Sequence, residues 1–400
     1  MRPRFIAALT RPGPWMFGTF WALESLSRSL IAAVISVAAY DLGGDETVMT
    51  FMYVVVGFFS VGSALAIPFV VHRLRPLRTY RLGALIVGLA PAVMALGNLP
   101  TFFVGMFGRV FGTNAMQVAL SLFIMGYIRK RDMSQSEPIR LLMAALPWAI
   151  GPTLGIWLYN NMGYAAPFLL SACVALILIC YAFLIRLDES PVMKAIPQKS
   201  ANPLTYLPRF VKQPRLRLAY LLIFGRENWW WMVYLYIPVY AEQNDMEVEV
   251  LGIHLPVGGL ALSFCSGLAL LAPVWGRIMR RLGMRLHLMT GLTLAAITVA
   301  AAGLMIDDPW IVIALVLVSA APISATDASG NIAFLRAVKS RERTEMAMVY
   351  GTYRDMVGLV VPTVYWILFK LGFQLDAVFF VTAGALLVYA FFARHLPRSM

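Results

Sequence analysis

Twelve apolar stretches, separated by short connections, constrain this 400-residue chain more than any other feature. About 20 apolar residues in a helix span the hydrocarbon core of a bilayer, and each stretch is near or above that length. The sequence therefore predicts an all-α membrane protein with twelve transmembrane helices. The stretches cover approximately residues 14–39, 48–71, 80–98, 101–128, 139–160, 164–186, 216–241, 250–276, 284–306, 310–335, 346–370 and 373–393.

The charges between these stretches alternate in sign along the chain. If both termini face the cytoplasm, the cytoplasmic segments hold 28 of the 33 Lys and Arg residues, and the opposite face holds one, Lys370. Cytoplasmic loops are rich in Lys and Arg, so the pattern predicts cytoplasmic termini and an even number of spans. The net charge of +13 is then a topology signal. No basic stretch stands beside a surface suited to nucleic acid, so no nucleic-acid partner is expected.

Composition excludes an ordinary soluble protein independently. The chain is 60% apolar and 13% charged, with a mean hydropathy of +0.74, which leaves too little polar surface to cover a soluble fold. The first stretch is too long for the apolar region of a signal peptide and carries Glu24 and Arg28, so it is predicted to be a retained helix. A multi-pass protein of the cell membrane follows, in the inner membrane if the source is bacterial.

The long connection between the sixth and seventh stretches divides the chain into two halves. It contains five prolines and lies on the predicted cytoplasmic side. We expect six-helix bundles at residues 1–187 and 215–400, joined by a cytoplasmic linker at 188–214. Short matches at a nearly constant offset, such as Gly151-Pro152-Thr153 with Val361-Pro362-Thr363, indicate a duplication. Parallel six-helix repeats are the architecture of one class of transporters.

Two motifs resemble those of the major facilitator superfamily, and the resemblance extends over essentially the whole chain. Residues 276–285 (GRIMRRLGMR) are similar to its loop between second and third helices, although Arg280 stands where an acid is expected. The matching positions, for which the resemblance implies a gating role, are Gly276, Arg277, Arg281 and Gly283. The fifth-helix signature of antiporters is similar to residues 151–155, which implies such a role for Gly151, Pro152 and Gly155. A fourth-helix arginine used for proton coupling in related exporters matches Arg109.

Eight ionisable residues lie inside the apolar stretches, four acids and four bases. An unpaired charge at the bilayer centre costs at least about 2.5 kcal/mol, so such residues turn inward and pair. Glu24 and Arg28 are four residues apart and share one helix face, as an intrahelical ion pair requires. The candidates for proton coupling are Glu24, Glu227, Asp327 and Arg109.

Further polar and aromatic residues are candidates to line a substrate cavity. In the superfamily the first, fourth, seventh and tenth helices line a central cavity, and this chain places charges on each of them. The alternative is that these residues form structural ion pairs and core packing. The candidates are Arg28, Thr113, Asn114, Gln117, Arg226, Asn228, Trp230, Trp231, Tyr234, Tyr350, Arg354 and Asp355.

These features predict a secondary active transporter that moves a small amphipathic, zwitterionic or charged organic solute by alternating access. Proton-coupled antiport or efflux is the first hypothesis, and proton-coupled uptake of an organic anion or nutrient is the second. A non-transporting assembly or receptor protein on the same fold is the third. No phosphate loop, metal-spaced cluster or nucleophile elbow is present, so the sequence predicts neither an enzyme nor a cofactor. A monomer with protons, a small solute and lipid as partners is expected.

Overall fold

The computed structural model describes residues 13–127, 133–185, 203–327, 329, 332–339 and 342–396, and these residues are mostly helical. They fall into two compact units. Unit 1 comprises residues 1–38 and 62–201, and unit 2 comprises residues 39–61 and 202–400. Residues 1–12 and 397–400, at the two termini predicted to be cytoplasmic, lie outside the described residues, as does most of the predicted linker.

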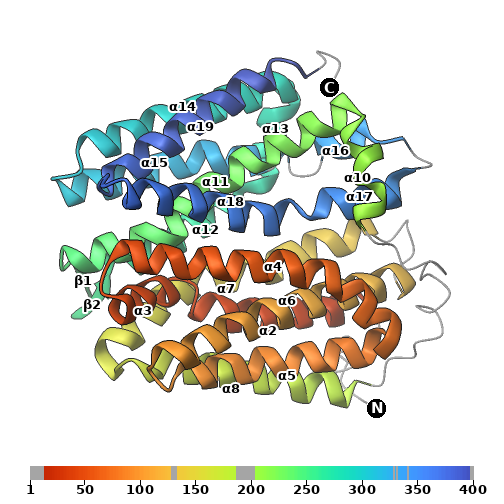
Figure 1. The fold of residues 1–400 in the computed structure, drawn as a ribbon, viewed down its shortest axis with the longest axis horizontal. Coiled ribbons are helices and arrows are strands. Elements are labelled where there is room, and N and C mark those ends of the chain that lie inside the picture. Colours follow the sequence, from red (N-terminus) through yellow and green to blue (C-terminus); the bar gives the residue numbers. More distant parts are fainter. Residues whose placement is uncertain are drawn as a thin grey trace. The chain divides into compact units, whose positions relative to one another are not determined.

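Unit 1 is built from long helices that pack along their sides. Figure 1 shows α5 beside α6 and α8, and α2 against α7 and α8. Its core joins apolar side chains of α2, α5, α6 and α8, including the fully buried Phe20, Met116 and Leu178. The helices are α2 (Pro14–Leu30), α3 (Val34–Gly43), α4 (Glu46–Leu74), α5 (Pro76–Met94), α6 (Leu99–Tyr127), α7 (Met133–Met162) and α8 (Ala165–Leu184), with α3 and α4 each divided between the units.

Unit 2 contains the remaining elements, and α14 packs against both α15 and α19. A two-stranded antiparallel hairpin pairs Glu247 with Pro256 and Val250 with Ile253. The elements are α10 (Pro203–Val211), α11 (Pro214–Gln243), β1 (Glu247–Val250), β2 (Ile253–Pro256), α12 (Val257–Gly267), the 3₁₀ turn η1 (Leu268–Leu271), α13 (Ala272–Leu282), α14 (Met284–Leu304), α15 (Pro309–Asp327), α16 (Ile332–Ala337), α17 (Arg343–Gly351), α18 (Tyr353–Lys370) and α19 (Asp376–Ala393).

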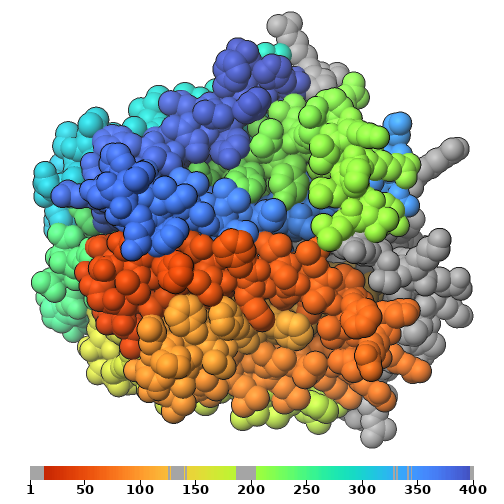
Figure 2. All heavy atoms as spheres, viewed as in Figure 1, coloured from red at the N-terminus to blue at the C-terminus, as the bar shows by residue number. Residues whose placement is uncertain are grey.

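The first half of α4 packs within unit 2, against α18. The carbonyl oxygen of Gly358 on α18 lies so close to Gly57 that a Cβ built there would be 2.6 Å from it. Thr50 and Tyr236 share a buried hydrogen bond of 2.8 Å between their hydroxyl groups. Figure 2 shows the red-orange atoms of this segment next to the blue atoms of α18. Small residues therefore allow the two helices to approach closely.

Nine helical segments in the described part of the chain are long and apolar enough to cross a membrane. Three further long helices, α6, α11 and α18, are not among the nine. Each of them carries ionisable residues inside its apolar stretch: Arg109 on α6, Arg226 and Glu227 on α11, and Arg354 and Asp355 on α18. These charges lower the hydropathy of helices that otherwise have the length of a span.

Several predicted helices are interrupted, which the apolar pattern alone does not indicate. The first stretch breaks between α2 and α3, and the eighth is α12, η1 and α13. The tenth is interrupted after Asp327, and the eleventh breaks at Thr352 between α17 and α18. Interruptions in membrane helices expose backbone groups and place helix ends inside the protein. In unit 2, Asp327, Arg354 and Asp355 lie at such ends, whereas Arg226 and Glu227 lie in the middle of α11.

Helix α10 is held to α17 by polar contacts outside the apolar stretches. Arg209 pairs with Glu342, and its Nη1 lies 3.2 Å from Oε2 of Glu345. Gln213 Nε2 donates a 2.9 Å hydrogen bond to Oε2 of Glu342. Phe210 turns to the other side and is buried in the unit 2 core with Leu216 and Met346. The helix is therefore fastened by one apolar face and one charged face.

We expect the contact between α10 and α17 to weaken in acid. The pKa of Glu342 lies below its ordinary value of 4.5, first because Gln213 donates a hydrogen bond to it and also because Arg209 does. A carboxylate with a lowered folded-state pKa contributes stability above its ordinary pKa and loses it as the pH falls through the folded pKa. Amide exchange in α10, corrected for intrinsic rates, should be about two- to fivefold faster at pH 3.5 than at pH 6. Arg209→Gln should reduce this difference, and an unchanged difference would contradict the assignment.

Candidate functional site

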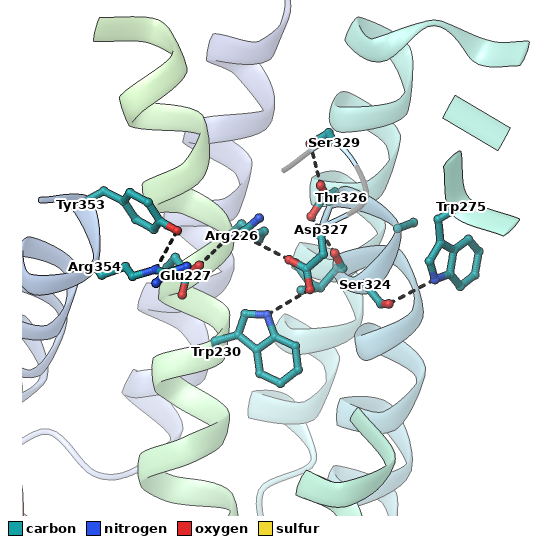
Figure 3. A network of polar contacts seen from close by, with 12 residues as sticks. Arg226, Glu227, Trp230, Trp275, Ser324, Thr326, Asp327, Ser329, Tyr353 and Arg354 are labelled. Atoms are coloured by element: carbon teal, nitrogen blue, oxygen red, sulfur yellow. Dashed lines mark hydrogen bonds and ion pairs between the residues drawn. The ribbon is translucent and has the colours of Figure 1, made fainter. Parts of the chain in front are cut away.

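A polar network in unit 2 joins α11, α15 and α18 around Arg226. Arg226 pairs with the neighbouring Glu227, and its Nε lies 2.9 Å from Oδ1 of Asp327 (Figure 3). The three side chains are 14%, 22% and 25% exposed, respectively. One guanidinium group therefore serves two carboxylates from different helices. Since the arginine stays charged at any physiological pH, changes in protonation fall on the acids.

Asp327 occupies the last residue of α15, which is an unfavourable position for a carboxylate. The C-terminal end of a helix carries partial negative charge. Two contacts offset this: the ion pair with Arg226 and a 3.3 Å hydrogen bond from Nε1 of Trp230 to Oδ2 (Figure 3). Asp327 is thus held by two side chains of α11, and movement of α11 relative to α15 would remove both.

Ser324 fixes the end of α15 against the interrupted eighth stretch. Its Oγ accepts a 3.1 Å hydrogen bond from Nε1 of Trp275 on α13 and donates a 2.9 Å bond to the carbonyl of Leu268 in η1. The carbonyl groups of an interrupted helix need such partners. The position of Asp327 is consequently set by α13 and η1 as well as by α11. Trp275 lacks a charged neighbour in sequence, so the motif analysis did not single it out.

The first turn of α18 supplies the third side of the network. Nε of Arg354 donates a 3.0 Å hydrogen bond to the hydroxyl of Tyr353 and lies within electrostatic reach of Glu227 (Figure 3). Asp355 accepts a 2.5 Å hydrogen bond from Ser60 on α4. A carboxylate in the first turn is stabilised by the helix dipole. Ser60 was not predicted, because an isolated serine in an apolar stretch gives no signal.

The three consecutive tryptophans of α11 have three different environments. Trp229 is fully buried and donates a 2.9 Å hydrogen bond to Ser319. Trp230 contacts Asp327 and stacks on Tyr234, with ring centroids 5.5 Å apart. Trp231 instead faces α18 and α4, against Gly358 and Tyr53. Among the described residues, Trp230 is the member of the triplet that contacts a charged group of the network.

Two candidate cavity residues serve packing in unit 2. Asn228 is buried and accepts a 3.1 Å hydrogen bond from the hydroxyl of Tyr365. Tyr350 is 4% exposed and stacks on Phe334, with centroids 4.3 Å apart. Both side chains lie among core residues in this structure, and their part in a substrate cavity stays a prediction.

In unit 1 the predicted pair on the first stretch is present. Glu24 is fully buried, and its Oε1 lies 3.1 Å from Nη1 of Arg28. Arg28 also lies over the ring of Trp148 on α7, 5.9 Å from its centroid. Such a contact extends the pair to a second helix.

On α6 a polar stripe is formed by Arg109, Thr113, Gln117 and Ser121 at steps of four, with Asn114 beside them. Thr113 is 9% exposed, and Nδ2 of Asn114 lies 3.4 Å from Oγ of Ser63 on α4. Steps of four residues align side chains along one face of a helix. The structure thus keeps the stripe on one helix face, while the coupling role of Arg109 stays a prediction.

A cavity of about 400 Å³ lies at the far end of α11, away from the network. Glu46, Tyr240, Gln243, Asp307 and Asp376 are among its lining residues. Tyr240 follows Arg226 by 14 residues, or about 21 Å along the helix axis.

Among the described residues, no group of three His, Cys, Asp or Glu side chains could hold a metal ion.

The loop between α13 and α14 in the second half and the loop between α4 and α5 in the first half share one backbone conformation. Gly283 precedes α14 with φ 79° and ψ 148°, and Arg75 precedes α5 with φ 69° and ψ 157°. Glycine adopts this conformation without strain, whereas a residue with a Cβ pays roughly 1–3 kcal/mol. The loop before α5 therefore keeps the backbone conformation of the loop before α14, although it has Arg75 where the other loop has Gly283.

The antiporter-like segment provides a close contact between α7 and α2. A Cβ on Gly155 would lie 1.8 Å from the carbonyl oxygen of Leu30, and one on Gly151 would lie 2.1 Å from Oγ of Ser29. Both contacts fall where α2 ends and the first stretch is interrupted. These glycines therefore have a packing role, whatever their part in gating.

Gly155→Ala should destabilise the protein by roughly 1–3 kcal/mol, because the added methyl group meets backbone rather than a movable side chain. The melting temperature of the purified protein in detergent measures the effect. Gly384→Ala is the matched control, since Gly384 is also within a helix and a Cβ there meets nothing within 4 Å. Equal melting temperatures for the two variants would show that the helices separate without cost.

Comparison with known proteins places these features in a family. The family model of the Major Facilitator Superfamily matches residues 21–362. A POT family transporter crystallised with 5-aminolevulinic acid is similar at a TM-score of 0.75 and 16% identity, with 96% of this chain and 97% of that chain covered. A peptide transporter POT in complex with sulfate is similar at a TM-score of 0.70 and 14% identity, with 98% of this chain and 97% of that chain covered.

The nucleoside transporter NupG gives a TM-score of 0.71 and 14% identity, with coverage of 93% and 97%. No curated protein matches the chain. At these identities the solved structures show the fold alone, whereas the family model covers most of the chain. The fold and the family are those of multi-pass membrane transporters rather than enzymes. The chain belongs to the major facilitator superfamily.

Proposed function

We propose that this protein is a proton-coupled secondary transporter that moves a small zwitterionic or charged organic solute by alternating access. The observation that carries the proposal is the contact of one arginine, Arg226, with two carboxylates, Glu227 and Asp327. These groups lie at the end of α15 and in the middle of α11. Ionisable residues inside membrane segments mark ion and substrate pathways.

Competition for Arg226 gives a physical route to coupling. When one carboxylate takes up a proton, it loses most of its attraction to the guanidinium group, which then pairs more fully with the other. A movement of α11 relative to α15 inside the C-terminal half, accompanying the movement of the two halves, changes the distance from Arg226 to Asp327 but not to its chain neighbour Glu227. The preferred protonation state of Asp327 would therefore depend on conformation, as proton coupling requires.

The same groups are suited to a zwitterionic solute. Arg226 and Arg354 offer planar donors for a carboxylate, and Glu227 and Asp327 offer acceptors for an ammonium group. Trp230 and Tyr234 add an aromatic face for apolar parts of the solute. The similar POT family transporter was crystallised with 5-aminolevulinic acid, which carries both charges. We infer a solute of this charge class.

Two transport directions are proposed, antiport first and symport second. The glycines of residues 151–155 resemble the antiporter signature, which favours efflux as the first proposal. Likeness to POT family structures crystallised with small molecules favours proton-coupled uptake as the second. A non-transporting role is the third, and a stable partner protein together with the absence of solute-dependent proton movement would support it.

Proteoliposomes with an imposed pH gradient test the proposal. Labelled 5-aminolevulinic acid and a panel of dipeptides serve as probes, and the lumenal pH is followed with a dye. Solute accumulation coupled to proton movement supports the proposal, and its direction in inside-out and right-side-out vesicles separates antiport from symport. No probe-dependent flux, together with no shift in melting temperature for any zwitterion, would contradict the solute class.

We further propose twelve spans with both termini in the cytoplasm and two six-helix halves joined at 188–214 as the moving parts. The charge distribution supports this arrangement, and so do the nine apolar segments together with the charged α6, α11 and α18. A reporter fused after Met400 should be active only in the cytoplasm, and one inserted within 242–249 only outside. The opposite result would overturn the topology.

A further inference from the structure

Four arginines lie at the corner where α13 turns into α14, and no acid lies near them in sequence. Arg277, Arg280 and Arg281 are exposed on α13, and Arg285 follows in the first turn of α14. From residue 250 to residue 306 the chain contains no Asp or Glu. Within the part of the chain that the structure describes, none of the four arginines makes an ion pair. The corner therefore carries four positive charges that the surrounding residues do not neutralise.

An apolar surface adjoins these charges. Val274, Ile278 and Leu282 follow at steps of four along α13 and are 41%, 36% and 46% exposed. No side chain of α13 is fully buried, so this stripe is not part of the core. Arg277 and Arg281 follow at the same spacing, which places a basic stripe next to the apolar one. An amphipathic helix of this kind lies at a membrane interface rather than inside a bundle.

A groove at the same corner is lined by both kinds of side chain. Its volume is about 330 Å³, and its lining residues are Leu282, Gly283, Met284, Arg285, Leu286 and Met289. Leu286 is 48% exposed, although it lies in a helix that belongs to an apolar stretch. A surface that is apolar on the side of the bilayer and cationic at its edge matches the two parts of a phospholipid.

We propose that this corner of α13 and α14 binds an anionic phospholipid of the cytoplasmic leaflet. An acyl chain would occupy the groove beside Leu282 and Leu286. The phosphate group would meet Arg281 and Arg285, because guanidinium groups bind phosphate oxygens in a bidentate manner. Basic sites at the cytoplasmic ends of membrane helices recognise anionic head groups in this way. The proposal uses the topology given above and is independent of the transported solute.

Native mass spectrometry of the full chain in detergent tests the proposal. Phosphatidylglycerol and phosphatidylcholine with the same acyl chains are titrated in separate samples. We expect the anionic lipid to bind about tenfold more tightly, because both lipids carry the same phosphate group but the choline of phosphatidylcholine adds a positive charge near the arginines. The double variant Arg281→Gln and Arg285→Gln should bring its affinity to that of phosphatidylcholine.

Matched variants distinguish lipid binding at this site from a general electrostatic attraction of anionic lipid to the protein. Arg215→Gln with Arg217→Gln removes the same charge from exposed positions at the start of α11 and should leave lipid binding unchanged. Leu286→Asn keeps the charge and should weaken both lipids alike, because it reduces the apolar lining. If the Arg281 and Arg285 variant does not fold, Arg277→Gln with Arg280→Gln provides a second reduction of charge, for which a severalfold loss is expected.

Three results would overturn the proposal. The first is equal binding of both lipids by the unaltered protein. The second is an equal loss of binding in the α11 control and the α13 and α14 variant, which would indicate charge alone. The third is displacement of the lipid by millimolar inorganic phosphate, which would show that the ligand is a free anion and that the groove has no part in binding.

Discussion

Glu227→Gln should abolish proton-driven accumulation of solute, whereas Arg226, Arg354 and Asp327 should maintain solute binding. A coupled transporter that moves one proton with or against each neutral solute can hold a concentration ratio of about tenfold under a gradient of one pH unit, since each unit corresponds to 1.36 kcal/mol. Glutamine keeps the shape of the side chain and cannot release a proton. The accumulation ratio should therefore fall to about one, and solute-induced shifts in melting temperature should remain.

Asp327→Asn separates the two carboxylates that contact Arg226. Because Asp327 also accepts a hydrogen bond from Trp230, the asparagine variant can keep that contact while losing the ion pair. If Glu227→Gln accumulates solute normally and Asp327→Asn does not, the proton site is Asp327 at the end of α15. Glu249→Gln is the control, since it removes an exposed carboxylate from β1 and should leave accumulation unchanged. Normal accumulation in both network variants would remove the network from coupling and leave Glu24 as the candidate.

Charge and hydropathy were sufficient to predict the membrane class, because the bilayer imposes a simple length and polarity on each span. They also located the charged residues of the network, since ionisable residues inside apolar stretches are rare. The superfamily resemblance was confirmed by the family model over residues 21–362. Twelve spans and the cytoplasmic termini stay predictions, because the described structure contains no membrane.

The interruptions of the helices could not be predicted from hydropathy. The stretch over residues 310–335 carries only scattered small polar residues and Pro322 before Asp327, and hydropathy alone does not show where α15 ends. This end of α15 also makes tertiary contacts, the bonds of Ser324 to Trp275 and Leu268. These partners lie about 50 residues away in sequence. A single sequence does not reveal contacts of this range.

The direction of each tryptophan side chain on α11 was the second feature that the sequence did not predict. Trp230, Trp231 and Tyr234 were all candidates to line one cavity, whereas Trp231 packs against Gly358 on α18. Consecutive residues of a helix are separated by about 100°, so a triplet of tryptophans necessarily covers most of its circumference. Which of the three meets a charge depends on where the neighbouring helices lie.

Removal of Arg226 should have the largest combined effect on stability and transport. Arg226→Gln leaves Glu227 and Asp327 without their shared cation, so two carboxylates remain close together in a region of low polarity. Breaking a fully buried ion pair costs about 3–5 kcal/mol. The network is partly exposed, so we expect a smaller loss, on the order of 1–3 kcal/mol, seen as a lower melting temperature in detergent. Transport should be lost as well.

A second substitution distinguishes the loss of stability caused by an unpaired carboxylate from the loss of a side chain that transport requires. In Arg226→Gln combined with Asp327→Asn, one carboxylate is removed together with the arginine, so much of the lost stability should return. Transport should stay absent, because the double variant has neither the cation nor the second acid. The coupling energy between the two sites, obtained from the single and double variants, measures the Arg226 and Asp327 interaction itself. Additive effects on melting temperature would mean that the 2.9 Å contact contributes nothing to stability, and restored transport would assign Arg226 a purely structural role.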